Sequence, residues 1–135
     1  MVVAGANSTS IFNGLRVLVV EDESLAALQL EQTLEEAGCI VLGPVATVEA
    51  ALTLLTDNVL GAALLDVQLL NGMITPVAER LRSLAVPFVL VSAYTGPELQ
   101  KPALANAPNV GKPVMKFRLL DTLANAVKAA AGSGA

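Results

Sequence analysis

Histidine is absent from the 135 residues of this chain, and cysteine occurs once. Without histidine, the chain has no histidine general base, no histidine metal ligand and no phosphohistidine of its own. Cys39 alone forms no intramolecular disulfide, and because it lies in an apolar segment we expect it to be a small buried hydrophobe. These absences leave carboxylates, hydroxyls and lysine as the groups that can carry chemistry.

A long hydrophobic run is missing as well. Hydrophobic residues make up 54% of the chain, but no run approaches the ~20 apolar residues that span a bilayer. Met1 to Gly14 lacks the basic region and the apolar core of a signal peptide, so we expect a cytoplasmic protein with no membrane partner. Acidic residues outnumber basic ones by 12 to 8, for a net charge of −4. This charge argues against nucleic-acid binding, which needs a basic surface.

The hydrophobic pattern predicts one domain in which strands and helices alternate. Strands are predicted at 15–20, 39–45, up to residue 66, 87–91 and 109–111. Helices are predicted at 24–37, 47–56, 75–84 and 116–131, with only short helical pieces at 97–101 and 103–106. This (βα)₅ alternation implies a doubly wound α/β fold, a five-stranded parallel sheet with helices on both faces. We assign 1–14 to a flexible N-terminal arm, 15–131 to the domain and 132–135 to a frayed C-terminus.

Amphipathic patterns predict which helix faces cover the sheet. In the first helix, Leu25 and Leu28 fall on the side opposite to the apolar stripe and are expected to face solvent. The loop before the third helix contains Asn71-Gly72, a turn pair. The last helix is expected to bury the apolar face formed by Phe117, Leu120, Leu123, Ala124 and Val127.

A carboxylate, Asp66, ends the apolar run that begins at Ala62. A buried parallel strand places the residue after it at the carboxyl edge of the sheet, where open α/β folds carry out their chemistry. The other predicted strands end in polar groups too. The groups at these ends are Glu21, Asp22, Ser92 and Lys112.

Each of these residues also has an ordinary structural interpretation. Glu21 and Asp22 could be acids favoured by a helix dipole, Ser92 a capping hydroxyl and Lys112 a solvated lysine. Their coincidence at four strand ends favours a common site. A cluster of carboxylates repels itself unless a cation compensates, and oxygen ligands suit Mg²⁺. With Lys112 and a hydroxyl nearby, such a site is equipped for phosphoryl transfer, with Asp66 as the nucleophile that becomes an aspartyl phosphate.

Four segments, Leu18 to Glu23, Leu64 to Leu69, Val91 to Ala93 and Gly111 to Pro113, resemble the receiver (CheY-like) domain of two-component response regulators. The resemblance covers about residues 15 to 131. It implies the flavodoxin/CheY-like fold with strand order 2-1-3-4-5.

The resemblance also assigns roles to individual residues. Asp66 matches the phosphoacceptor, and Asp22 the direct Mg²⁺ ligand with Glu21 beside it. Gln68 matches the residue whose backbone carbonyl ligates the metal. Ser92 and Lys112 match the phosphoryl-binding hydroxyl and lysine, and the lysine is followed by a proline in cis, here Pro113.

One position departs from the family pattern. Receivers usually carry Tyr or Phe three residues before the lysine, where this chain has Asn109. Instead, Tyr94 stands two residues after Ser92. This placement resembles the single-domain receivers named for a Phe-Ala-Thr-Gly-Tyr motif. We therefore nominate Tyr94 as the switch residue.

The sequence thus predicts a stand-alone receiver that takes a phosphoryl group from a histidine kinase or a histidine phosphotransfer protein with Mg²⁺ as cofactor. It would catalyse its own phosphorylation and dephosphorylation rather than act as a conventional enzyme. Leu25 and Leu28 are expected to contact the donor, and the signal would pass to a downstream protein by docking or drain into a phosphate sink. We expect a monomer or weak dimer. Two alternatives stay open: a small haloacid-dehalogenase-like phosphohydrolase, although Gln68 fills the place of its second aspartate, and a phosphorylation-independent binding module.

Overall fold

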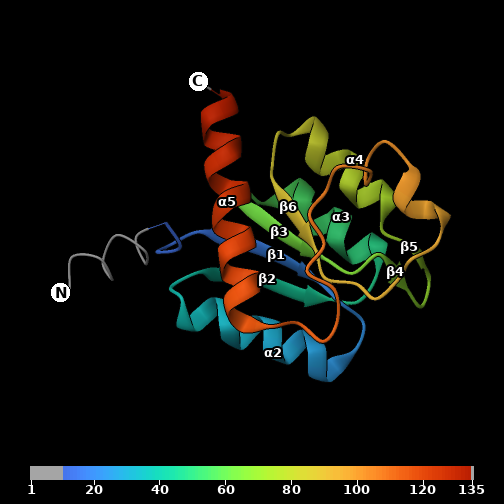
Figure 1. Cartoon of the computed structure of the whole chain (residues 1–135), viewed down its shortest axis with the longest axis horizontal. Helices are drawn as coiled ribbons and strands as arrows, with labels where there is room; N and C mark the ends of the chain where they lie inside the picture. Colours follow the sequence, from blue (N-terminus) through green and yellow to red (C-terminus); the bar gives the residue numbers. More distant parts are fainter. Residues whose placement is uncertain (1–10, 135) are drawn as a thin grey trace.

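The computed structural model describes residues 11–134, so residues 1–10 of the expected arm and Ala135 lie outside the described part. Four parallel strands form the central sheet in the order β2-β1-β3-β6 (Figure 1). The strands are β1 (Arg16–Val20), β2 (Ile40–Val45), β3 (Ala62–Leu65) and β6 (Phe88–Leu90). The helices are α2 (Ser24–Glu36), α3 (Val48–Asp57), α4 (Thr75–Ser83) and α5 (Lys116–Gly134), with a 3₁₀ turn, η1, at Pro97–Gln100. The predicted α/β class and the order of its first four strands are confirmed.

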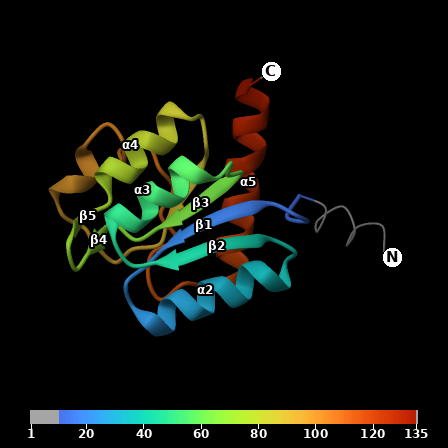
Figure 2. The same cartoon turned by 180° about the vertical axis from the view of Figure 1, so that it is seen from behind.

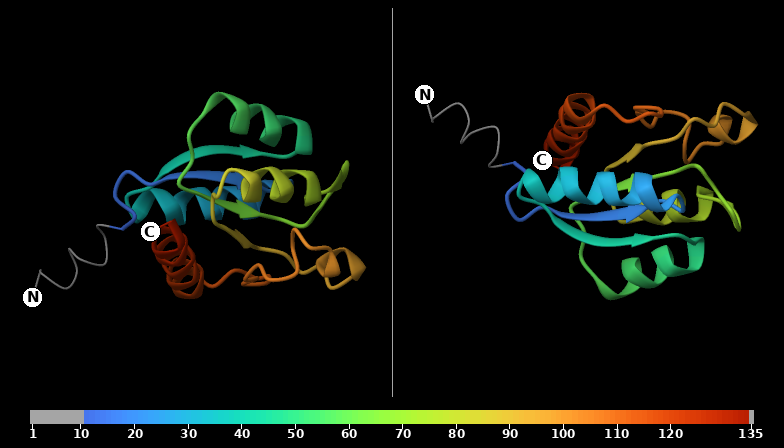
Figure 3. Two further views of the ribbon diagram at one scale, coloured as in Figure 1. Left: turned by 90° about the horizontal axis from the view of Figure 1, so that it is seen from above. Right: turned by 90° about the horizontal axis from the view of Figure 1, so that it is seen from below.

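Two apolar layers hold the helices against the sheet. Successive side chains of a strand point to opposite faces, so Leu18 and Val20 of β1 pack with residues of α3 and α4. Val17 and Val19 pack on the other face with residues of α2 and α5. Figures 1 and 2 show these two faces, and Figure 3 shows α3 and α5 on opposite sides of the sheet. Because both faces are covered, β1 and β3 contain few polar residues.

The crossovers bring the carboxyl ends of the strands to one edge of the sheet. β1 lies between β2 and β3 and pairs in parallel with both. The chain therefore leaves β1 on one side for β2 and returns on its other side in β3, and a crevice opens at such a switch point. The strand arrowheads in Figure 1 point toward this edge, where the β4–β5 hairpin also lies.

The predicted fifth strand at 109–111 is reduced to a single parallel bridge between Leu90 and Asn109. Two hydrogen bonds make this bridge, Leu90 N–H to Pro108 O at 2.8 Å and Val110 N–H to Leu90 O at 3.0 Å. Pro108 has no N–H to extend the ladder backward. Gly111 adopts a φ of 71°, which takes the chain out of the extended conformation. The predicted five-stranded sheet is therefore observed as four strands, with a single bridge residue at the place of the fifth.

A short hairpin replaces the irregular loop expected after Asp66. It consists of β4 (Gln68–Leu69) and β5 (Gly72–Met73), paired antiparallel. The two residues between the strands, Leu70 and Asn71, make the turn, so the predicted turn pair is shifted by one residue. The hairpin holds Leu70 near the carboxyl edge of the sheet.

Helix α5 begins where expected and packs four residues of the predicted apolar face against the core, Leu120, Leu123, Ala124 and Val127. It differs from the prediction at Phe117 and in its length. Leu119 and Leu123 are fully buried, whereas Phe117 is 83% exposed. Two residues along a helix correspond to a turn of about 200°, so Phe117 cannot share the face of Leu119. The helix continues to Gly134, three residues beyond the expected end.

The described part begins with a turn at residues 11–14 rather than a loose arm. Phe12 is buried, and Gly14 N–H donates to Gly38 O at 2.9 Å. Gly38 follows helix α2 with a φ of 104°, a conformation that glycine adopts readily at the C-terminal end of a helix. Cys39 is buried, as expected. Among residues 11–134, no helix has the length and apolar character needed to cross a membrane.

Candidate functional site

Asp66 lies directly after β3, whose four apolar residues are all buried. Its N–H donates to Val20 O at 2.9 Å, which continues the β1–β3 ladder by one residue and fixes where the loop begins. The residue is only 5% exposed. The carboxylate is thus held at the carboxyl edge of the sheet by the end of a fully buried strand.

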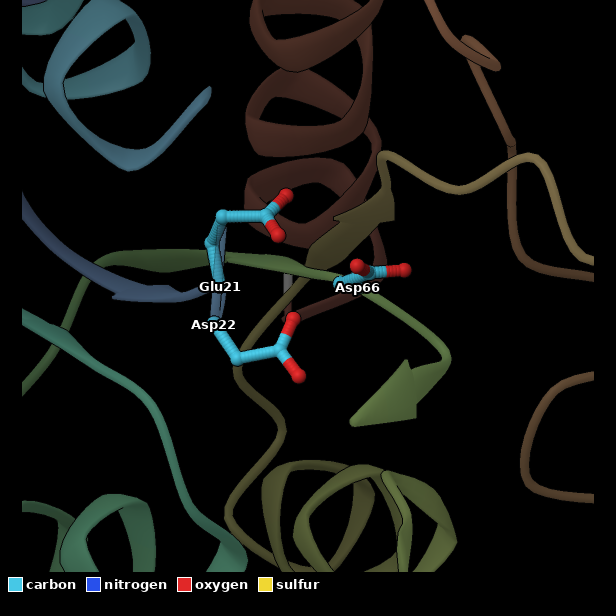
Figure 4. Close-up of side chains that lie close together, drawn as sticks. All are labelled: Glu21, Asp22 and Asp66. Atoms are coloured by element: carbon cyan, nitrogen blue, oxygen red, sulfur yellow. The ribbon is translucent and has the colours of Figure 1, made fainter. Parts of the chain in front are cut away.

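Two further carboxylates follow β1 and meet Asp66. Oxygens of Glu21, Asp22 and Asp66 all lie within 4.8 Å of one another (Figure 4). Glu21 is buried and Asp22 is half-buried. The meeting follows from the pairing of β1 with β3, since the residues just past two neighbouring parallel strands share one edge of the sheet.

Main-chain donors orient two of these carboxylates. Asp22 Oδ2 accepts the N–H of Leu70 at 2.7 Å, a bond that ties the first strand end to the β4–β5 hairpin. Glu21 Oε2 accepts the N–H of Glu23 at 3.0 Å. Hydrogen bonds to the ionised form favour a carboxylate over a carboxylic acid.

Lys112 reaches into this cluster from the segment before α5. Its Nζ lies 2.9 Å from Glu21 Oε1, 2.6 Å from Glu23 Oε1 and 3.0 Å from Asp66 Oδ2. The contact with Glu21 Oε1 is close but not aligned as a hydrogen bond, which leaves this buried oxygen without one. The three clustered carboxylates and one ammonium sum to a charge of −2 (−3 plus +1).

Burial and charge shift two pKa values in the cluster. Burial raises the pKa of Glu21 above its usual value, and the ion pair with Lys112 opposes this only in part. Burial also lowers the pKa of Lys112, but its close contacts with Glu23, Glu21 and Asp66 outweigh that effect and raise it overall. Lys112 therefore stays an ammonium at neutral pH.

The donor set fits a hard divalent cation. Oxygens are its only ligands, the charge of −2 is what such an ion compensates, and Glu21 Oε1 is a buried acceptor without an aligned donor. Mg²⁺ is commonly held by one or two carboxylates and keeps its remaining positions for water and phosphate oxygens. The acidic cluster could therefore hold the cation predicted from the sequence.

Ser92 and Tyr94 complete the pocket from the loop after β6. Ser92 is 3% exposed, and its Oγ accepts the N–H of Tyr94 at 3.1 Å. The pocket has a volume of about 480 Å³. Its lining includes Asp22, Glu23, Asp66, Gln68, Ser92, Tyr94 and Lys112. Residues from four strand ends therefore line one pocket.

Tyr94 lies folded back over its own loop. Its phenol oxygen accepts the N–H of Glu98 at 3.2 Å, and its ring leaves no space for a side chain at Gly96. Glu98 in turn accepts a hydrogen bond from Thr75 at the start of α4. This bond lowers the pKa of Glu98 below its usual value. The loop that carries Ser92 is thereby fastened to α4.

The remaining predicted residues lie around this pocket. The peptide bond between Lys112 and Pro113 is cis. Leu25 and Leu28, 68% and 48% exposed, lie on the solvent side of α2, as the helical pattern predicted. A groove beside α2 is lined by Leu25, Lys112 and Pro113 among others.

Two residues of the site were not predicted from the sequence. Glu23 contacts Lys112 across 89 positions of the chain, although the acidic run Glu21-Asp22-Glu23 was a signal that it could. Asn109 accepts hydrogen bonds from the backbone of Ser92 and of Gly111. Sequence reasoning noted only that it lacks an aromatic ring.

Comparisons by sequence alone give no match, either among protein-family models or among curated proteins. Comparison of structures does. The signal receiver domain of a modulated diguanylate cyclase from Desulfovibrio desulfuricans G20 is 27% identical at a TM-score of 0.80, with 90% of this chain and 99% of that chain covered.

Two further solved structures agree with it. The PhyR receiver domain of Erythrobacter litoralis is 28% identical at a TM-score of 0.73, with 86% of this chain and 92% of that chain covered. A CheY-like receiver domain protein from Methanospirillum hungatei JF-1 is 24% identical at a TM-score of 0.79, with 90% and 99% covered. The narrower Phe-Ala-Thr-Gly-Tyr subfamily stays a prediction. The chain thus has the CheY-like fold, and its structural neighbours are receiver domains of response regulators.

Proposed function

We propose that this receiver domain accepts a phosphoryl group on Asp66 from a phosphohistidine of a histidine kinase or a histidine phosphotransfer protein. The observation that carries the proposal is the environment of one carboxylate. Asp66 borders the pocket and has Lys112 Nζ 3.0 Å from its Oδ2. Two more acids lie within 4.8 Å of it. A nucleophilic carboxylate, a fixed ammonium and a cation-binding cluster are the parts that phosphoryl transfer requires.

In the transfer step, an oxygen of Asp66 forms a bond to the phosphorus while the bond between phosphorus and the donor imidazole nitrogen breaks. The imidazole nitrogen keeps the electron pair of that bond, and Asp66 becomes an aspartyl phosphate. Lys112 is positioned to neutralise charge on the phosphoryl oxygens, and Ser92 Oγ to donate a hydrogen bond to one of them. Attack by water on phosphorus later releases inorganic phosphate and restores the carboxylate, so the domain would catalyse its own dephosphorylation.

The residues that would hold Mg²⁺ are Glu21, Asp22 and Asp66, together with the backbone carbonyl of Gln68. When bound, this ion supplies positive charge that offsets the repulsion between carboxylates and phosphoryl oxygens. Asp22 is supported in this role by the N–H of Leu70, which fixes the orientation of its carboxylate. Glu21 lies deeper and has a raised pKa because of its burial.

The signal would leave the domain through a protein partner. The groove beside α2 borders both Lys112 and the exposed Leu25, so a donor that docks there is adjacent to the pocket. After transfer, the domain would pass its signal to a downstream protein by docking, or act as a phosphate sink.

Substitution of the phosphoacceptor tests this proposal. We expect Asp66→Asn to abolish transfer of label from a phosphorylated donor, because the amide is not a nucleophile for phosphorus. Asp121→Asn, at an exposed position of α5, is the matched control and should be labelled like the wild type. Label that persists on Asp66→Asn would contradict the assignment. Steady turnover of small phosphoesters by the wild type would instead indicate a phosphohydrolase.

A further inference from the structure

Asn109 makes two hydrogen bonds that connect the loop after β6 with the segment before Lys112. Its Oδ1 accepts the N–H of Ser92 at 3.2 Å and the N–H of Gly111 at 2.9 Å. The oxygen must be the atom that faces both groups, because a carboxamide nitrogen cannot accept a hydrogen bond. One side chain therefore joins the loop after β6 to the segment that leads into Lys112.

The hydrogen bond from Ser92 N–H to Asn109 Oδ1 replaces a backbone hydrogen bond that a longer fifth strand would make. Leu90 pairs in parallel with Asn109, and its N–H and C=O are bonded to Pro108 and Val110. In a regular parallel ladder, the next N–H to face the same way would be that of Ser92, and its acceptor would be the carbonyl of Val110. The positive φ of Gly111 ends the strand at this point. Asn109 Oδ1 receives the Ser92 N–H in place of that carbonyl.

The second bond fixes the turn itself. In an Asx-turn, a side-chain oxygen accepts a hydrogen bond from the N–H two residues later. In this chain the N–H of Gly111 donates to Asn109 Oδ1, and Lys112 follows immediately. The bend is therefore set by the same atom that holds Ser92, so the two pocket residues are positioned together rather than independently.

We propose that Asn109 is a positioning residue that holds the Ser92 hydroxyl and the Lys112 ammonium at a fixed separation beside Asp66. The inference rests on the proposed function, because both groups are needed at once only if a phosphoryl group lies between them. A phenylalanine at this position has no acceptor, and the only acceptor of a tyrosine is the hydroxyl at the far end of its ring, so neither has an oxygen two bonds from its Cβ as Asn109 does. Misplacement of a reacting or binding group by about 1 Å can slow a reaction roughly 100-fold. A side chain that fixes the loops of both Ser92 and Lys112 therefore affects the rate of phosphorylation directly.

Three variants separate positioning from simple loss of structure. Asn109→Ala removes the acceptor without adding bulk, and Asn109→Leu removes it at similar volume. Asn109→Asp keeps an oxygen that can accept both N–H bonds. Thermal melting establishes that each variant folds, and if Asn109→Leu does not, Asn109→Ala carries the comparison.

The measurements are hydrogen exchange of individual amides by NMR and the rate of labelling by acetyl phosphate at several Mg²⁺ concentrations. In Asn109→Ala, the amides of Ser92 and Gly111 should exchange about tenfold faster, the effect of one lost hydrogen bond. The maximal labelling rate should fall roughly 10-fold to 100-fold. The Mg²⁺ concentration at half-saturation should not change, since the acidic cluster follows β1 and β3. Asn109→Asp should keep the protection and label within roughly threefold of the wild type.

Three results would overturn the inference: wild-type labelling of Asn109→Ala, unchanged exchange of the two amides, or an Asn109→Asp variant as slow as Asn109→Ala. A parallel loss of Mg²⁺ affinity in Asn109→Ala would also count against it, because it indicates general disruption of the pocket. A wild-type chain that no donor labels would refute the proposed function. The exchange measurement would still decide whether Asn109 holds the two loops.

Discussion

At the scale of single residues, Lys112 is the only positive charge among the acids of the pocket that the structure describes. It contacts Glu21, Glu23 and Asp66 and so compensates one of several negative charges. Glu21 is desolvated, because its side chain is fully buried. A charge held in such a place destabilises the fold unless it is paired. Glu21 is therefore the residue at which a charge change should affect stability most clearly.

We expect Glu21→Gln to raise the free energy of unfolding by about 1 kcal/mol at pH 7 in the presence of a chelator. Burial raises the pKa of Glu21 in the folded state above the usual 4.5. Below that usual value the group is protonated in both states and costs nothing. The cost appears as pH rises through the unfolded and then the folded pKa.

The stabilisation of Glu21→Gln should therefore be present at neutral pH and disappear in acid. Denaturant titrations at several pH values measure it. Glu35→Gln, at an exposed position of α2, is the control and should stay within about 0.5 kcal/mol of the wild type at every pH. A gain for Glu21→Gln that grows as pH falls would contradict the account.

Single residues also mark what the sequence could and could not predict. Asp66 and Asp22 were predictable because the residue after a buried parallel strand lies at a known edge of the sheet. Asn109 was noted only as a missing aromatic, since its bond to Ser92 spans 17 positions and depends on where the fifth strand stops. Phe117 was misassigned because its helical position differs from that of Leu119 by about 200°.

At the scale of elements, the loop after β6 carries both Ser92 and the nominated switch residue. Tyr94 is held by the N–H of Glu98, and Glu98 is held by Thr75 of α4. A phosphoryl group that draws Ser92 toward Asp66 would pull on this loop. The effect should reach Tyr94 first, because Ser92 Oγ accepts its N–H.

The fluorescence of Tyr94 reports this coupling directly, since the chain has one tyrosine and no tryptophan. We expect the emission to change when acetyl phosphate and Mg²⁺ label the wild type, and to stay constant in Asp66→Asn under the same conditions. Emission that does not respond while labelling proceeds to completion would exclude Tyr94 as the switch.

Helix α2 presents the surface on which the donor is expected to dock. We expect Leu25→Asp to slow transfer from a phosphorylated donor roughly tenfold and to leave labelling by acetyl phosphate unchanged, because the pocket itself is intact. Val59→Asp is the matched control. Val59 is 83% exposed and precedes β3, at the opposite edge of the sheet. Equal rates of transfer to the wild type and to Leu25→Asp would show that the donor does not dock on this surface.

Helices and strands with a local sequence pattern were predicted correctly. Those whose existence or length depends on pairing with another strand were not. Apolar runs located the strands and helices, and the helix predicted at 47–56 is observed as α3 after Thr47, whose side chain accepts the N–H of Ala50. The hairpin of β4 and β5 was missed because each strand has only two residues, too few for any periodicity. The length of the fifth strand was overestimated because an apolar residue such as Val110 favours a strand but does not indicate the turn that follows at Gly111.

At the scale of the whole molecule, the charges of the pocket connect cation binding to stability. An ion that binds only the folded state stabilises it, and at 100 times its Kd the gain is about 2.7 kcal/mol. We expect Mg²⁺ to raise the Tm in a concentration-dependent way that a chelator reverses. Asp22→Asn should have a higher Tm than the wild type without Mg²⁺, because it relieves repulsion, and should respond weakly to the ion. If the Tm of the wild type does not change with Mg²⁺ concentration, the proposed cation site is wrong.

The central claim is that Asp66 becomes an acyl phosphate. Its most direct test is to locate the modification by mass spectrometry of peptides after exposure of the wild-type chain to a phosphorylated donor and Mg²⁺. We expect one added phosphoryl group, found in the peptide that contains Asp66, labile to hydroxylamine and absent when Mg²⁺ is chelated. A stable phosphoryl group on a serine or threonine, or no modification with any phosphohistidine donor or acetyl phosphate, would contradict it.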